Sequence, residues 1–296
     1  MPASERPEQE RGLWEIDDTC IDCDVARQLA PGTVVQSAGR SVLARQPAGP
    51  QEHRALEQAA VACPVQSIRL GGRRVGTDPF PLRLDGEVHL CGHTSARTFG
   101  ANAYLVGRPE GNLLVDTPRW SSAVADAYER GGGIAHILLT HRDHTAHAER
   151  FARHFGARVW IHEGDLDAAP YADGVLRGTS PVEVLPGVVA HPVPGHTRGS
   201  TVYVVDERYC FTGDTLYWSR AAQDLDVFET VVWHSRPELI ASLLRLARRA
   251  RFGWVLPGHG DRCHLPADEL HERLLGLVAR MRARAPRPVD ITEVAW

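Results

Sequence analysis

From residue 81 onward, the chain places metal-ligand residue types behind a series of short apolar runs. These runs are rich in β-branched residues and have the length of buried strands: IAHILLT (134–140), VVAHPV (188–193), YCFTG (209–213) and FGWVLPG (252–258). The polar residues that follow them are His141, His196, Asp214 and His259. Because strand ends meet at one edge of a sheet, we expect these four side chains to converge on one site.

Helical patterns separate several of these runs. SSAVADAYERGGG (121–133) begins with serines and stops at glycine, and SRPELIASLLRLARRA (235–250) has a Ser cap, an early Pro and an apolar stripe. Strands alternating with helices predict an α/β layered domain.

The first part of the chain has a different character. The chain of 296 residues, 43% of them hydrophobic, has room for one large domain or two unequal ones. The stretch GGRRVGTDPFPL (71–82) is punctuated by Gly and Pro, and the strand and helix alternation begins after it. We therefore predict two domains, residues 1–80 and 81–296.

Charge and composition exclude several functions. The formal net charge is -4, and no basic patch dominates, so we expect no nucleic-acid partner. No apolar run approaches the roughly 20 residues that cross a bilayer, and no secretion signal is present, so we expect a cytoplasmic protein without a membrane partner. All 33 basic side chains are arginine, which excludes Schiff-base, pyridoxal and P-loop chemistry that needs lysine.

The order of the strand-end segments resembles one family. LLVDTPRW, LLTHRDHTAH, PVPGHTRGSTVYVV, CFTGDTLYW and VLPGHGDRC follow one another from about residue 88 onward as in the metallo-β-lactamase fold. The resemblance implies an αββα sandwich that binds metal. It also implies that His196, Asp214 and His259 are metal ligands.

The segment THRDHTAH departs from the family pattern. The usual motif H-x-H-x-D-H places ligands at its first, third, fifth and sixth positions, where this chain has His141, Asp143, Thr145 and Ala146. Two ligands are missing, and the third position is a carboxylate. A branch of the family that carries THRDDVADH here, often fused to a ferredoxin-like domain, is the more similar one.

The residues themselves predict one complete ligand set. His141 and Asp143 alternate on an extended segment, so both can face one ion that His196 and Asp214 complete. If a helix begins near His144, then His144 and His147 lie on its inward face. They either reach a second ion held by Asp214 and His259 or are hydrogen-bonded core histidines.

The N-terminal cysteines resemble a single-cluster ferredoxin domain of the α+β class. CIDCDVA and the later ACP supply Cys20, Cys23 and Cys63, but Ala26 stands where the third cysteine of the C-x2-C-x2-C pattern belongs. Three thiolates could hold a three-iron cluster, or a four-iron cluster with one open position. We favour a domain that keeps the fold and has lost its iron–sulfur cluster.

These observations lead to three hypotheses of function. The leading one is a hydrolase of an ester, thioester or related small organic substrate, acting through hydroxide on one or two zinc or iron ions, with Asp143 or His144 orienting the attack. A second is a non-haem iron oxidoreductase coupled to the ferredoxin-like domain and a possible redox partner. A third is a non-catalytic scaffold with degenerate sites. The sequence leaves the oligomeric state open.

Overall fold

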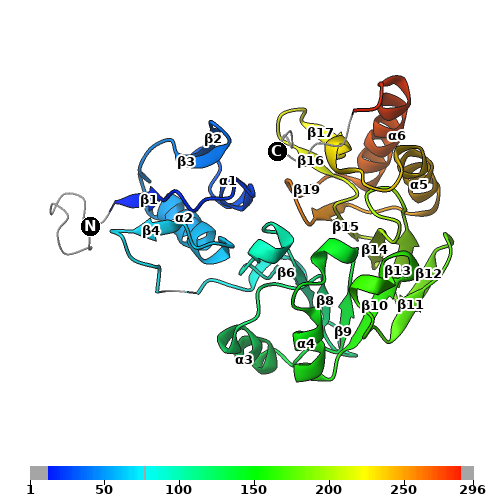
Figure 1. Ribbon diagram of the computed structural model, residues 1–296, viewed down its shortest axis with the longest axis horizontal. Helices are drawn as coiled ribbons and strands as arrows, with labels where there is room; N and C mark the ends of the chain where they lie inside the picture. The colour runs from blue at the N-terminus through cyan, green and yellow to red at the C-terminus, as the bar shows by residue number, and fades with distance from the viewer. Residues whose placement is uncertain (1–12, 77, 288–296) are drawn as a thin grey trace.

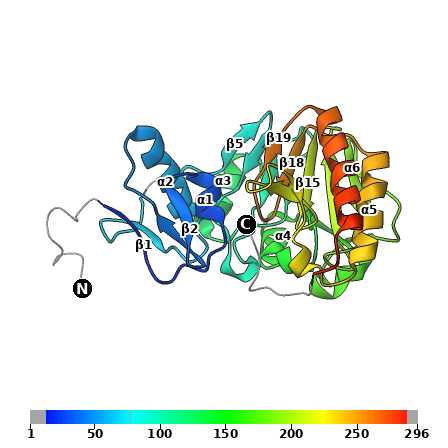
Figure 2. The same cartoon turned by 90° about the horizontal axis from the view of Figure 1, so that it is seen from above.

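The computed structural model describes residues 13–76 and 78–287. Figure 1 shows a small N-terminal group of elements at one end of a larger body built on two sheets, and Figure 2 shows the same arrangement from above. No helix in the described part of the chain is both long enough and apolar enough to cross a membrane.

The N-terminal group combines two helices with two small antiparallel sheets. In chain order its elements are β1 (Trp14–Ile16), α1 (Val25–Leu29), β2 (Val34–Ser37), β3 (Arg40–Leu43), α2 (Pro50–Ala62) and β4 (Ile68–Leu70). Strand β1 pairs with β4 and β2 with β3. Helix α2 begins with Pro50, whose missing N–H is not needed in a first turn, and packs Leu56 and Ala59 against Trp14 and Ile68. This agrees with the α+β class, and the domain boundary at residue 80 stays a prediction.

The first sheet of the larger body has seven strands in the order β11-β10-β9-β8-β7-β6-β5. They are β5 (Leu82–Asp85), β6 (Val88–Leu90), β7 (Tyr104–Val106), β8 (Leu113–Val115), β9 (His136–Leu138), β10 (Arg158–His162) and β11 (Gly174–Leu176). Strands β5 to β8 form an antiparallel meander, and β8 to β11 run parallel. The parallel part requires crossovers, which α3 (Ser122–Arg130) and α4 (Ala148–Phe155) supply.

The second sheet has six strands in the order β12-β13-β14-β15-β18-β19. They are β12 (Val182–Leu185), β13 (Val188–Pro192), β14 (Thr201–Val205), β15 (Tyr209–Gly213), β18 (Trp254–Pro257) and β19 (Cys263–His264). The hairpin of β16 (Tyr217–Ser219) and β17 (Asp224–Asp226) stands apart from it. Helices α5 (Arg236–Arg249) and α6 (Ala267–Ala283) complete this half.

Side chains along each strand point alternately to the two faces of its sheet, so each sheet contributes to two separate core layers. In β14, Tyr203 and Val205 point into the cluster between the two sheets, whereas Val202 and Val204 point into the cluster beneath α5 and α6. Helices α3 and α4 cover the opposite face of the first sheet through Val124 and other apolar residues. The order helix, sheet, sheet, helix confirms the predicted αββα sandwich.

The chain around His144 differs from one expectation. A short 3-10 turn, η4 (Arg142–His144), follows β9, and helix α4 begins only at Ala148. The expectation that His144 and His147 share one helical face is therefore wrong. The tight turn changes the direction of the chain between them, so His144 is buried whereas His147 is half-buried.

Candidate metal centre

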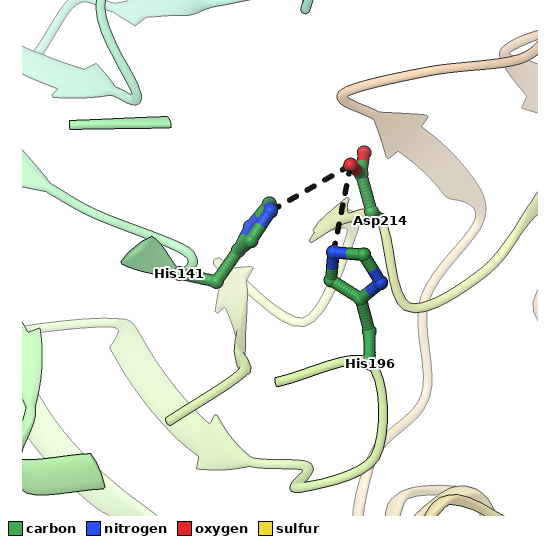
Figure 3. Close-up of side chains that lie close together, drawn as sticks. All are labelled: His141, His196 and Asp214. Carbon is green, nitrogen blue, oxygen red and sulfur yellow. Dashed lines mark ion pairs between the residues drawn. The ribbon is translucent and has the colours of Figure 1, made fainter. Parts of the chain in front are cut away.

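Three of the predicted ligands come together beyond the ends of strands from both sheets. His141 follows β9, His196 follows β13, and Asp214 comes directly after β15. Figure 3 shows both imidazole rings directed at the Asp214 carboxylate, with Asp214 Oδ2 lying 3.6 Å from His141 Nε2 and 3.9 Å from His196 Nε2. We call His141, His196 and Asp214 the first group; its ligand atoms lie within 4.8 Å of one another.

A second group shares Asp214. His144 Nε2 lies 3.5 Å from Asp214 Oδ2, and His259 Nδ1 lies 2.8 Å from Asp214 Oδ1. His144, Asp214 and His259 again place their ligand atoms within 4.8 Å. Gly258 is needed beside them, since a Cβ there would meet His144 Cε1 at 2.4 Å.

Among the histidines of these two groups, three have a buried ring nitrogen without a hydrogen-bond partner among the described residues. They are the Nε2 atoms of His141, His144 and His196. Leaving a buried polar atom unpaired costs free energy, so each such atom requires an explanation. A divalent cation beside the carboxylate of Asp214 would satisfy all three, and imidazole with carboxylate is a ligand set that zinc and iron accept.

The opposite ring nitrogens show which tautomer each histidine adopts. His196 Nδ1 lies 2.6 Å from the Val231 carbonyl oxygen, which can only accept, so Nδ1 carries the hydrogen and Nε2 keeps its lone pair. For His259, Nε2 lies 3.2 Å from the Phe99 carbonyl oxygen, so Nε2 carries the hydrogen and Nδ1 faces Asp214. Such outer contacts orient metal ligands and raise their basicity.

Asp116 supports the other two histidines, and sequence reasoning did not select it. Its carboxylate accepts hydrogen bonds from His144 Nδ1 at 2.8 Å and from Thr140 N and Oγ1 at 2.9 and 2.8 Å. Because the Thr140 hydroxyl donates to Asp116, its oxygen is left to accept from His141 Nδ1 at 3.0 Å. The position of Asp116 directly after β8 was a usable signal, since it is also a strand end.

Burial and charge act on the group together. Burial alone would raise the pKa of Asp214, but the facing His259 and His144 outweigh it and hold that pKa well below its usual value. Burial also lowers the pKa of His144, yet the carboxylates of Asp214 and Asp116 reverse this and raise it to about 10. Burial and the neighbouring His144 lower the pKa of His141 well below its ordinary value.

Two further predicted residues take different places. Asp143 is half exposed, and its Oδ2 lies 3.7 Å from His141 Nε2 and 3.5 Å from His196 Nε2, so it reaches the first group from the open side. His147 does not reach either group: its Nε2 lies 3.0 Å from Ser95 Oγ. The role of His147 as a ligand has no support in this arrangement.

A pocket of about 360 Å³ opens over both groups. Its wall is largely apolar and comes from the turn η3 (Ala96–Thr98) and from the loop around η6 (Glu229–Val231). The lining residues outside the two groups are Ala96, Arg97, Thr98, Phe99, Asp143, Phe228, Val231 and Trp233.

The N-terminal cysteines lie together with the residue that replaces a ligand. Cys20, Cys23 and Cys63 line one small cavity with Ala26. Burial raises the pKa of the Cys23 thiol to about 12, and Cys63 Sγ lies 3.4 Å from Ser67 Oγ. The methyl group of Ala26 cannot bind iron, so the donor set does not fit a four-iron cluster held by four thiolates.

The sandwich and its strand-end histidines define a class of metal-binding α/β proteins, and comparisons with known proteins identify the family. A family model described as the metallo-beta-lactamase superfamily matches residues 89–278, and one described as the 4Fe-4S single cluster domain of ferredoxin I matches residues 16–70. The chain belongs to the metallo-β-lactamase superfamily. Both resemblances expected from the sequence are confirmed.

Individual relatives cover parts of the chain. A hydroxyacylglutathione hydrolase of Anaeromyxobacter dehalogenans is 41% identical over 122 residues, 39% of this chain and 46% of that protein. The thioesterase pkgB of Emericella nidulans is 30% identical over 175 residues, 55% of this chain and 46% of that protein. The matched regions span about half the length of these curated relatives.

Solved structures support the fold. The DIM-1 metallo-β-lactamase exposed to ceftazidime has a TM-score of 0.51 at 16% identity, over 67% of this chain and 95% of that one. The mono-zinc form of the FIM-1 metallo-β-lactamase from Pseudomonas aeruginosa has a TM-score of 0.50 at 21% identity, over 67% of this chain and 93% of that one.

Proposed function

We propose that this chain is a metal-dependent hydrolase of thioesters or esters of small organic acids. The observation that carries the proposal is the set of three buried imidazole Nε2 atoms without hydrogen-bond partners, all directed at one carboxylate. His141, His196 and Asp214 would hold one ion, and His144, Asp214 and His259 a second. A divalent ion held there supplies a Lewis acid that makes water nucleophilic at neutral pH and polarises a carbonyl oxygen.

The chain's own residues have separate tasks. Hydrogen bonds to the Val231 carbonyl and the Thr140 hydroxyl hold the His196 and His141 rings with Nε2 inward. Asp143 lines the pocket and has a half-exposed carboxylate, so it is placed to accept a proton from attacking water and return it to the leaving group. We therefore assign the proton transfer to Asp143 and metal binding to His144.

The relatives and the pocket wall support zinc and a thioester substrate. The relatives described above are a hydroxyacylglutathione hydrolase and a thioesterase, and one structural neighbour is a mono-zinc form. The apolar wall formed by Phe99, Phe228 and Trp233 suits the hydrocarbon part of a small acyl group.

A non-haem iron oxidoreductase is the second candidate. It is favoured by the proximity of the Asp143 carboxylate to His141 and His196, since two histidines with a carboxylate also suit Fe(II). Ala26 weighs against it, because an incomplete cluster site is a poor electron donor.

The test is hydrolysis by metal-free protein reloaded with zinc, Fe(II) or Mn(II). The substrates are a 2-hydroxyacyl thioester of glutathione, a simple acyl thioester and the matching oxygen ester. We expect thioester hydrolysis that depends on added metal and is absent from His196→Ala. The control is His154→Ala, which removes a surface histidine paired with Glu129. Metal binding without hydrolysis of any of the three substrates would contradict the proposal, and oxygen consumption by the iron form would favour the second candidate.

A further inference from the structure

A buried carboxylate joins the N-terminal group to the larger body. Asp24 has a fully buried side chain, and both of its oxygens accept hydrogen bonds of 2.9 Å from Arg220 Nη1 and Nη2. The same guanidinium donates from Nε to Asp261 Oδ2 at 2.8 Å. Asp261 is two residues beyond His259, so Arg220 connects the cysteine-bearing group directly to the loop that carries a predicted metal ligand.

A second connection runs through residues 94–102. Thr94 donates from N and Oγ1 to the Ala62 carbonyl oxygen at 3.1 and 2.7 Å, and Asn102 Nδ2 donates to Gln28 Oε1 at 3.0 Å. Gly100 has a φ of +85°, and a Cβ at this position would lie 2.7 Å from Cys23 Cβ. The backbone at Gly100 therefore packs directly against the side chain of Cys23, and only glycine fits at position 100.

The same segment forms one side of the metal pocket. The Phe99 carbonyl accepts from His259 Nε2, and Asn102 N donates to the Gly258 carbonyl oxygen at 2.8 Å. Residues 96–99 line the pocket itself. The two connections thus converge on His259, one through Asp261 and the other through Phe99.

We propose that the ferredoxin-like domain is a positioning element of the metal pocket, with Arg220 as the residue that couples the two. None of the described residues 13–76 lines the pocket, so the domain acts by holding the residues that do. The inference rests on the proposed function only in taking His259 as a ligand. It gives the domain a task that does not need a complete cluster.

Arg220 is suited to this task because its planar guanidinium serves both carboxylates at once. Replacing it by lysine keeps the charge but loses the two-sided hydrogen bonding. Groups that orient metal ligands typically contribute about 10–100-fold to metal affinity. We therefore expect Arg220→Gln to lower the affinity for the ion at His144, Asp214 and His259 about 10–100-fold. The affinity for the ion at His141 and His196 should stay within about threefold of the wild-type value.

The experiment titrates the metal-free full-length protein with Co²⁺ and follows visible absorption, which reports the two ions by separate affinities. Arg220→Lys should give an intermediate affinity for the second ion. Arg108→Gln is the control, because Arg108 also forms an ion pair with an aspartate, through Nη1 to both carboxylate oxygens of Asp206, and neither residue lines the pocket. It should match the wild type. Asp24→Asn removes the carboxylate that pairs with both Arg220 and Arg27, keeps the Arg220–Asp261 pair, and serves if Arg220→Gln does not fold.

A second measurement needs no metal. Hydrogen–deuterium exchange should become faster in residues 95–102 and 258–262 of Arg220→Gln and stay unchanged in Arg108→Gln. A folded Arg220→Gln protein with wild-type Co²⁺ affinities and wild-type exchange would overturn the inference. Wild-type protein that binds no Co²⁺ would instead contradict the proposed hydrolase, while the exchange measurement would still decide the inference.

Discussion

The candidate metal centre and the cysteine cavity both lack residues that their family patterns require, but only at the candidate metal centre does another potential ligand lie nearby. At the metal centre, Thr145 and Ala146 stand at ligand positions, and His144 from the adjacent turn reaches Asp214 instead. At the cysteine cavity, Ala26 stands at a ligand position, and the described residues lining the cavity add only the hydroxyls of Ser41 and Ser67 as polar side chains. Ser41 already accepts from Arg27.

The two sites differ in whether a neighbouring group holds a substitute ligand in place. We propose that His144 takes the place of a missing ligand, because Asp116, directly after β8, accepts a hydrogen bond from its other ring nitrogen and so fixes the imidazole. No equivalent support exists for a fourth ligand beside Cys23 among the described residues. This contrast agrees with our two proposals, in which the larger body carries the chemistry and the smaller one supports it.

The largest effect is expected from His196→Ala. The variant removes one of the unpartnered Nε2 atoms. Loss of a group that only orients a ligand lowers metal affinity about 10–100-fold, so loss of a ligand itself should lower metal affinity and hydrolysis by more than about 100-fold. Metal content after dialysis and a thermal unfolding curve check it. A variant that is folded and fully loaded with metal would remove the contrast between the two regions.

Asp116→Asn should have the next largest effect. The substitution keeps the shape but replaces an acceptor that serves His144 and Thr140, so metal affinity should fall about 10–100-fold. Isothermal titration with zinc measures it. Equal affinities in variant and wild type would mean that His144 does not depend on this support.

Ala26→Cys tests the cysteine cavity by restoring the missing ligand. Wild-type protein purified in air should hold fewer than four irons per chain, because Ala26 offers no ligand. The variant should retain at least about twice as much iron and sulfide after anaerobic reconstitution. Iron and sulfide analysis with visible absorption checks both. Four irons and four sulfides in the wild type would show that the cysteine site is complete without residue 26.

The smallest effect concerns a histidine outside both regions. Burial, together with Arg249, lowers the pKa of His191 to about 4 from an ordinary value of 6.5. As the pH falls, His191 is therefore protonated in the unfolded chain before it is protonated in the folded one. The free energy of unfolding is unaffected by this group above pH 6.5, falls between pH 6.5 and 4, and stays at the lower level below pH 4.

Because one pKa unit corresponds to about 1.4 kcal/mol and the titration is incomplete at pH 5.0, the loss between pH 7.5 and 5.0 should amount to roughly 2 kcal/mol. Urea unfolding at pH 7.5 and 5.0 measures it, and His191→Leu should remove this part of the pH dependence. An unchanged pH dependence in that variant would assign the effect to the histidines of the metal centre.

The strand-end residues were predictable because apolar runs and the ligands behind them are both local features of the sequence. The sandwich, its helices and the positions of His141, His196, Asp214 and His259 follow from them. His144 lies beside Asp214 and His259, which was one of the two alternatives that the sequence left open. The sequence could not decide between them, because the position of His144 depends on a single 3-10 turn that hydrophobic periodicity does not reveal.

Contacts between residues far apart in the chain also could not be predicted from the sequence. Arg220 and Asp24 are 196 residues apart, and nothing in either local sequence indicates the pair. His147 lies outside the metal groups because helix α4 starts four residues after His144, which sends its ring toward Ser95.

The most direct test of the metal centre is anomalous X-ray diffraction from crystals of the full chain, measured at the zinc and iron absorption edges. We expect a strong anomalous peak at one of these edges among His141 Nε2, His196 Nε2 and Asp214 Oδ2. Protein crystallised with either metal in excess and showing no peak at this position would contradict it.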